Sequence, residues 1–173
     1  MLLKQTVPPA TLAVSLADAK AHLRIDTTDE DALIESMIST ATRMAEAYTQ
    51  RQIVSATFVA TWPEPPTGET LRLPITPLIS VTSVTVDGDA FTDFTAVSDD
   101  TKAYLESDEW PREGEVVVTY VAGYTSTPPA FDAAIKMLVS GMFQHREAVT
   151  DAKLEMNHAT MWILDTVGVP KVV

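Results

Sequence analysis

The chain has 173 residues and contains no cysteine. A chain of this length forms one ordinary domain, or one domain with a modest insertion, and needs no covalent cross-links to fold. Without cysteine, a disulfide framework, a thiolate zinc site, an iron–sulfur cluster and a cysteine nucleophile are all excluded. The 24 acidic side chains outnumber the 12 basic ones, and the formal net charge of −12 argues against a protein that grips nucleic acid.

Residues 1–15 hold two consecutive prolines and lack the unbroken apolar core of a signal peptide. No stretch of the sequence approaches the roughly 18 apolar residues that a membrane-spanning helix needs. We therefore expect a soluble intracellular protein with no membrane segment.

Hydrophobic spacing predicts two helices before residue 52. Ser15 and Asp18 have the spacing of a capping box ahead of a short helix that extends to about Ile25. Thr28 and Asp31 repeat this spacing before the clearest amphipathic helix, which covers about residues 30–51. Its apolar residues recur at intervals of three and four and predict one buried stripe, consisting of Ile34, Met37, Ile38, Ala41, Ala45 and Tyr48.

From Gln52 the hydrophobic period becomes two, which is typical of β-strands. The strand at 79–86 alternates apolar and hydroxyl side chains, and the Asp87-Gly88 pair that follows is a hairpin-turn signal. The other predicted strands lie at 53–62, 71–73 and 115–121, with weaker ones at 91–97 and 103–105. The sequence therefore predicts five or six antiparallel strands, in a small sheet or a sandwich.

Pro128-Pro129 introduces a second long helix that extends to about residue 147, with Ile135, Leu138 and Met142 in its apolar stripe. We expect an α+β fold in which the helices of residues 1–51 pack on the helix of residues 128–148. Residues 52–127 are then an inserted antiparallel β-region. Residues 149–173 form a C-terminal tail outside this core, with a short helix expected near 152–156.

The acidity is concentrated in the predicted β-region. Residues 52–127 carry a net charge of −9, against −2 for residues 1–51 and −1 for residues 128–173. One interpretation is an ordinary solvated surface that keeps the protein soluble. The other is a surface that must not adhere to a polyanion passing close to it, and charge alone does not separate the two.

The sequence carries no motif for catalysis, metal binding or a cofactor. Its three histidines, His22, His145 and His158, lie at least 13 residues apart, which excludes a helical two-histidine zinc motif. A G-x-S-x-G nucleophile elbow and a phosphate-binding glycine spacing are also absent. The acidic turns at 87–89 and 99–100 lack the further oxygen ligands of a calcium loop. We expect no enzyme, no metal and no cofactor; a metal-dependent hydrolase assembled from distant residues is the enzymatic alternative.

The tail holds a short apolar run, Met161, Trp162, Ile163 and Leu164, on a segment that the sequence pattern does not connect to the core. This run either folds back on its own domain or docks on a neighbouring subunit or another partner. In the second case Trp162 would be the buried anchor.

Several short motifs, taken in order, carry a family resemblance. They are L-x-x-A-K-x-H-L-R-I at 16–25, D-x-D-x-L-I at 29–34, L-P-x-x-P-L-x-S-V-x-S-V at 73–84, the Trp110-Pro111 pair, V-T-Y-x-A-G-Y at 118–124 and F-x-x-R-E at 143–147. Their order and spacing over about residues 12–148 resemble the head-tail connector (adaptor) proteins of long-tailed phages and related gene-transfer particles.

The resemblance implies structural work without catalysis. Such connectors form a ring, typically of twelve subunits, that binds beneath the portal after genome packaging, extends the DNA channel and gives the tail or its stopper a docking surface. The implied partners are further copies of this chain, the portal protein and a stopper or tail-terminator protein. Double-stranded DNA would pass through without specific binding.

The same resemblance implies a location in the neck of the virion, after assembly in the cytoplasm of a bacterial host. By analogy, residues 149–173 would be the segment that reaches the portal or a neighbouring subunit. A tail-completion or stopper protein of the same neck is the alternative function.

Overall fold

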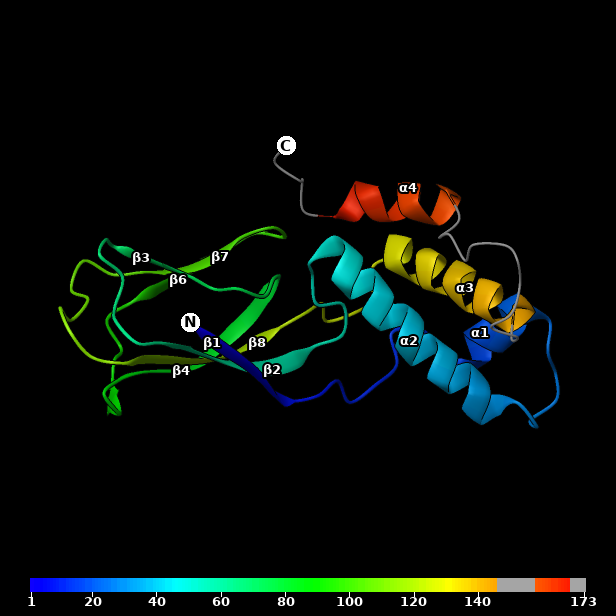
Figure 1. The fold of residues 1–173 in the computed structure, drawn as a ribbon, viewed down its shortest axis with the longest axis horizontal. Coiled ribbons are helices and arrows are strands. Elements are labelled where there is room, and N and C mark those ends of the chain that lie inside the picture. The colour runs from blue at the N-terminus through cyan, green and yellow to red at the C-terminus, as the bar shows by residue number, and fades with distance from the viewer. Residues whose placement is uncertain (146–157, 169–173) are drawn as a thin grey trace. The chain divides into compact units, whose positions relative to one another are not determined.

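The structure, a computed structural model, describes residues 1–145 and 158–168 (Figure 1). In these ranges it contains four helices and two antiparallel sheets, which confirms the expected α+β class. The chain divides into two compact units. We call them the sheet unit, Met1–Ala10 with Val54–Thr125, and the helical unit, Thr11–Ile53 with Ser126–Val173.

The sheet unit begins with a strand that the sequence pattern does not indicate. Strand β1 (Leu2–Val7) pairs antiparallel with β2 (Ala56–Trp62), from Leu2 opposite Thr61 to Val7 opposite Thr57. It is an edge strand with mostly exposed side chains, so its sequence lacks the two-residue alternation of a half-buried strand. Residues 1–10 therefore lie with the sheet, whereas the sequence interpretation assigns them to the helical core.

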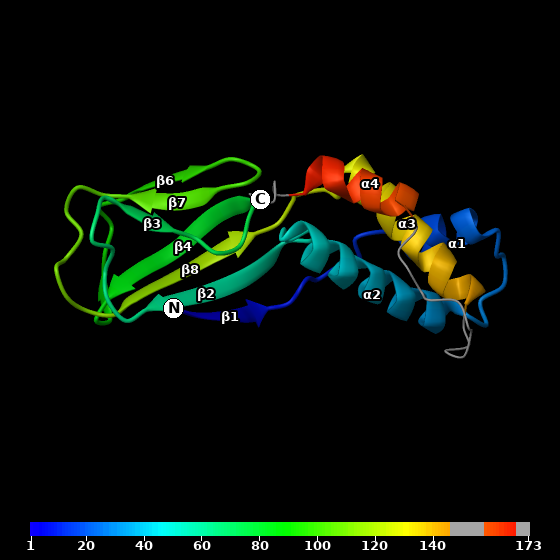
Figure 2. The same cartoon turned by 45° about the horizontal axis from the view of Figure 1, so that its top comes forward.

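Two antiparallel sheets make up the sheet unit (Figure 2). The larger has the order β1-β2-β8-β4-β5, in which the strands not yet introduced are β8 (Val116–Ala122), β4 (Leu78–Val86) and β5 (Asp89–Ala90). The smaller has the order β3-β7-β6, with β3 (Thr70–Arg72), β7 (Ala103–Glu106) and β6 (Thr95–Ser98). Within residues 52–127, which the structure describes in full, this makes seven strands, more than the five or six expected.

Buried side chains from both sheets form one hydrophobic core, as in a sandwich. Burial alternates along β2 and β8, so that the rings of Phe58 and Tyr120 meet inside with centroids 5.9 Å apart. Leu71 of β3 and Leu105 of β7 enter the same core from the smaller sheet. The alternation that marks these strands in the sequence thus follows their burial.

Strand β4 departs from its regular sequence pattern. Its pairing with β8 shifts between Leu78 and Ser80 and again between Val81 and Ser83, and Ile79 is left on the surface. Each β-bulge adds a residue and so reverses the face on which the following side chains lie. The Asp87-Gly88 turn after β4 is confirmed, with φ of 51° and 89°, the two positive values that a type I′ hairpin turn requires.

The strand expected at 91–97 begins only at Thr95. Before it, Phe91 stacks on Trp110, with ring centroids 4.9 Å apart, and also lies against Phe94. Aromatic residues that indicate a strand in the sequence here hold a loop against the core, so tertiary packing overrides local propensity.

The helical unit contains α1 (Leu16–Leu23), α2 (Asp31–Thr49), α3 (Pro129–Gln144) and α4 (His158–Val167). Ser15 caps α1, and its Oγ accepts a hydrogen bond from the Asp18 N–H at 3.0 Å, as expected. The cap expected at Thr28 is wrong. Glu30 is the N-cap of α2 and makes no side-chain capping bond, while the Asp31 carboxylate pairs with Lys20 of α1.

Helices α2 and α3 pack on each other, and α1 and α4 each pack on both of them. Most residues of the expected core stripes are buried; these are Ile34, Ile38, Ala41, Ala45, Ile135 and Leu138. Met37, Tyr48 and Met142 are half-buried at the edges of the stripes. The helix expected near 152–156 lies outside the described residues.

Candidate interaction surfaces

The apolar run at residues 161–164 lies within a helix, α4, that packs on α2 and α3. Leu164 is fully buried, Met161 and Ile163 are half-buried, and 75% of Trp162 is exposed. Thr160 and Leu164, four residues apart, share the inner face of the helix, and Trp162 lies between them on the opposite side. The structure therefore separates the run into a core residue, Leu164, and a surface aromatic residue, Trp162.

A hydrogen bond connects α4 to α2 beside this surface. The Tyr48 hydroxyl donates to the Asp165 carboxylate over 2.7 Å. Because deprotonation of Tyr48 would break this hydrogen bond and also place two negative charges together, the pKa of Tyr48 is raised. Just after α4, a Cβ on Gly168 would lie 4.0 Å from the Thr49 Cα, so the chain here lies close to the end of α2. These contacts fix how α4 lies on its own unit and so where Trp162 projects.

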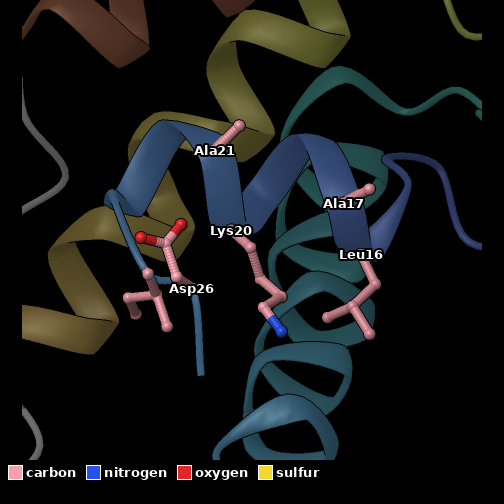
Figure 3. A pocket seen from close by; sticks show the side chains of 6 residues that line it. Leu16, Ala17, Lys20, Ala21 and Asp26 are labelled. Atoms are coloured by element: carbon pink, nitrogen blue, oxygen red, sulfur yellow. The ribbon is translucent and has the colours of Figure 1, made fainter. Parts of the chain in front are cut away.

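A second candidate surface is a shallow pocket beside α1, with a volume of about 390 Å³ (Figure 3). It is lined by one face of α1 and the chain that follows, namely Leu16, Ala17, Lys20, Ala21, Ile25 and Asp26. Arg24 ends α1 with a φ of 59°, and the Ile25 N–H then donates back to the Lys20 carbonyl. This left-handed cap turns the chain so that Ile25 and Asp26 close one end of the pocket.

Lys20 contributes its aliphatic stem to this pocket while its ammonium group reaches toward α2. There it forms an ion pair with Asp31, and only 14% of the Lys20 side chain is exposed. The pocket is therefore mostly apolar, with the Lys20 ammonium held in its pair with Asp31 and the Asp26 carboxylate at the rim. Nothing in the sequence pattern points to this pocket, because it depends on the turn after α1.

The third surface is acidic. The sheet unit has twelve Asp and Glu against four Lys and Arg, a net charge of −8, and all twelve acidic residues are exposed. Ten of them lie at the end of the sandwich where β2 ends and β8 begins (Figure 1); they are Glu64, Glu69, Asp87, Asp89, Asp93, Glu106, Asp108, Glu109, Glu113 and Glu115. In the loops of this end, residues 63–69, 87–94 and 107–115, Arg112 is the one basic residue.

Two acidic residues of the sheet unit have a structural task in turns. Asp87 Oδ1 accepts a hydrogen bond from the Glu115 N–H at 2.7 Å, joining two loops of the acidic end. At the other end, hydrogen bonds from Thr101 and Lys102 stabilise the Asp99 carboxylate and lower its pKa. In the turns at 87–89 and 99–100, an aspartate carboxylate thus accepts hydrogen bonds from backbone N–H groups.

The described residues contain no group of three or more His, Cys, Asp or Glu side chains arranged to hold a metal ion. His22, His145 and His158 are all exposed. Among the helices in the described ranges, none is both long and apolar enough to cross a membrane.

The sequence matches the head completion protein family over residues 13–168. The chain belongs to this family. This membership confirms, at the level of the family, the resemblance inferred from the sequence motifs. No curated protein sequence matches the chain.

The fold of this head completion family member also occurs in solved structures of gene transfer agent (GTA) particles. A chain in the neck of an empty GTA particle, computed with C6 symmetry, matches with a TM-score of 0.82 and 22% identity, over 100% of this chain and 98% of that chain. A chain in the virion of a native GTA particle matches with a TM-score of 0.81 and 21% identity, at the same coverage. One in the neck of a native particle, computed with C12 symmetry, has a TM-score of 0.77 and 20% identity, again at that coverage. These chains share the fold along the whole length.

Proposed function

We propose that this chain is a structural head-tail connector, or adaptor, in the virion neck of a tailed phage or phage-like particle. In this role twelve copies form a ring beneath the portal, extend the DNA channel and present the surface on which the tail or its stopper docks. The observation that carries the proposal is the family match over residues 13–168, together with a whole-chain fold shared with chains in GTA necks. The protein acts without catalysis, after assembly in the bacterial cytoplasm.

The charge distribution supports passage of DNA without binding. Affinity for a DNA backbone comes largely from Lys and Arg that displace counterions. The sheet unit has twelve exposed carboxylates and a net charge of −8, so it repels a polyanion. Nothing in this distribution would retain DNA inside a channel.

Ring assembly needs surface that becomes buried only in the complex. Trp162, 75% exposed on α4, is the largest such side chain in the described part of the helical unit. Aromatic residues of this kind act as anchors in protein interfaces. We assign Met161, Trp162, Ile163 and Leu164 to the tail anchor, with Trp162 as the contacting residue and Leu164 as the one that seats α4 on its own unit.

Mixing the purified protein with its portal tests this function. We expect a ring-like complex by mass photometry or electron microscopy, and failure to join any portal complex would contradict the connector role. Isolated monomers do not decide the matter, because the portal can act as a template. Contact with a tail protein but never with the portal would favour a stopper. Stoichiometric zinc, calcium or manganese in the purified protein would favour the hydrolase alternative.

A further inference from the structure

Two features of the helical unit are complementary and lie on different helices. An aromatic side chain projects from α4 at Trp162, and an apolar pocket lies beside α1. Helices α1 and α4 each pack on α2 and α3, so each copy can present both features at once. A projection and a pocket at different places on one molecule produce a head-to-tail contact, which closes into a ring when the rotation is suitable.

The pocket has the size and lining that an indole ring needs. Its volume of about 390 Å³ is at the lower end of the range for pockets that bind small ligands. The apolar side chains of Leu16, Ala17, Ala21 and Ile25 would cover the faces of the ring. A tryptophan has roughly 150–250 Å² of surface to bury, which makes it the most effective single anchor for such a site.

Polar side chains flank both features. The exposed residues next to Trp162 on its face of α4 are His158 and Ala159 on one side, and Asp165 and Thr166 on the other. With a rise of 1.5 Å per residue, His158 lies about 6 Å and Asp165 about 4.5 Å along the helix from Trp162.

The pocket is flanked by Lys20 of α1 and by Asp26, which follows the C-terminal end of α1. If α4 of one copy lies antiparallel to α1 of the next, His158 approaches Asp26 and Asp165 approaches Lys20. Lys20 and Asp165 keep their partners within the chain, Asp31 and Tyr48, so the new contacts extend pairs that already exist.

We propose that Trp162 of one copy inserts into the α1 pocket of the next copy, and that this repeated contact builds the ring. The proposal rests on the connector function and names the occupant of the pocket as a second copy of this chain. It assigns Trp162 to the subunit contact and not to the portal contact.

The absence of native cysteine allows a direct test. Ala21→Cys marks the pocket and Ala159→Cys marks the helix beside Trp162; both alanines are exposed. One single variant, carrying a size tag, is mixed with the other, assembled on the portal and mildly oxidised, so that only a contact between copies gives the mixed dimer. We expect this dimer on a non-reducing gel. A matched control replaces Ala21→Cys by Ala47→Cys, an exposed alanine on α2, and should leave the mixed dimer at background.

The outcomes separate this inference from the function on which it rests. Loss of the crosslink when Trp162→Ala is added to Ala159→Cys would support the inserted indole. A portal-bound ring without the crosslink, equal crosslinking with Ala47→Cys, or crosslinking of Ala159→Cys to the portal would each overturn the inference and leave the connector role intact. Failure to form any portal complex with the unmodified protein would overturn both.

Discussion

Two glycines show how differently one residue type is constrained in this chain. Gly123, at the end of β8, has a φ of 126°, and a Cβ on it would lie 2.7 Å from the Ser55 Cα. Gly141 lies inside α3, and within the described part of the chain no atom beyond its chain neighbours and the helix's own backbone comes within 4 Å of a Cβ built on it. The first position needs glycine for its backbone and its close neighbour. At the second position, glycine has no such role and only lowers the stability of the helix.

We expect Gly123→Ala to destabilise the sheet unit by roughly 2–4 kcal/mol, because left-handed backbone strain and a clash with backbone add together. Gly141→Ala should instead raise the free energy of unfolding by up to ~1 kcal/mol, through helix propensity. Urea unfolding of both variants measures the contrast. Equal effects of the two substitutions would show that the close approach at Gly123 is not rigid.

Tyr120 provides a pH prediction at the residue scale. It is fully buried in the sandwich core, its hydroxyl oxygen accepts a hydrogen bond from the Ile75 N–H at 3.3 Å, and burial raises its pKa to about 12. An unfolded chain loses this proton near pH 10, whereas the folded protein keeps it to about pH 12, so unfolding releases a proton between these values. The contribution to stability is therefore present below pH 10 and is lost as the pH rises above it.

Tyr120→Phe should remove this part of the pH dependence. We expect the free energy of unfolding of the variant to be about 1 kcal/mol lower at neutral pH, because the Ile75 N–H loses its hydrogen-bond acceptor. Its free energy of unfolding should then fall less steeply than that of the unmodified protein between pH 10 and about 12. Denaturant unfolding at several alkaline pH values checks this, and parallel slopes would contradict the buried, neutral phenol.

At the scale of elements, α4 combines a structural face and a free face. Leu164→Ala empties a fully buried position and should cost about 2–5 kcal/mol, while Trp162→Ala should change stability by less than ~0.5 kcal/mol. Thermal unfolding of the two variants tests this division. A large drop in Tm for Trp162→Ala would mean that the indole belongs to the core of its own chain.

Helix α2, like α3, packs on all three other helices of its unit. Ile38 is fully buried in its stripe, and Ile38→Asp places an unpaired charge there, so the helical unit should fail to fold. Far-ultraviolet circular dichroism measures the loss of helix. Ser39→Asp, at the exposed neighbouring position, is the matched control and should leave the spectrum unchanged.

Sequence periodicity predicts the elements whose burial is regular and misses those whose burial is not. The stripes of α2 and α3 and the alternation of β2 and β8 correspond to buried faces. Edge strand β1 has hardly any buried face, and helix α4 is only ten residues long, so neither gives a clear signal on its own. Thr160, Leu164 and Val167 have the spacing of four and three that a helix face requires, but the segment is too short for this to stand out.

The candidate surfaces follow the same division. Trp162 is identifiable from the sequence because it lies in a short apolar run that the sequence pattern does not connect to the core. The α1 pocket is not, since it depends on the left-handed Arg24 cap and on where the chain turns afterwards. The split of the apolar run into buried Leu164 and exposed Trp162 requires knowing that α4 is a helix and which face it buries.

At the scale of the whole molecule, charge separates the two units. The sheet unit carries −8 of the total of −12, and the helical unit carries −4. Repulsion between subunits is weaker where charge is lower, which favours packing of copies through the helical units. In the proposed connector, the acidic end of the sheet unit would then be left to face solvent, passing DNA or a basic partner surface.

The same charge predicts that the protein does not bind double-stranded DNA, even at low salt, where electrostatic binding is strongest. Fluorescence anisotropy of a labelled duplex titrated with the protein at low ionic strength measures this. We expect no change in anisotropy. Saturable binding that weakens with added salt would show a basic surface able to hold DNA and would contradict passage without retention.

The most direct test of the connector role is a cryo-EM reconstruction of the protein assembled with its portal. We predict a closed ring of copies beneath the portal, with helical units in contact around the ring and Trp162 buried between neighbouring copies. A reconstruction in which the protein is absent from the portal, or is bound only to tail components, would contradict the connector role.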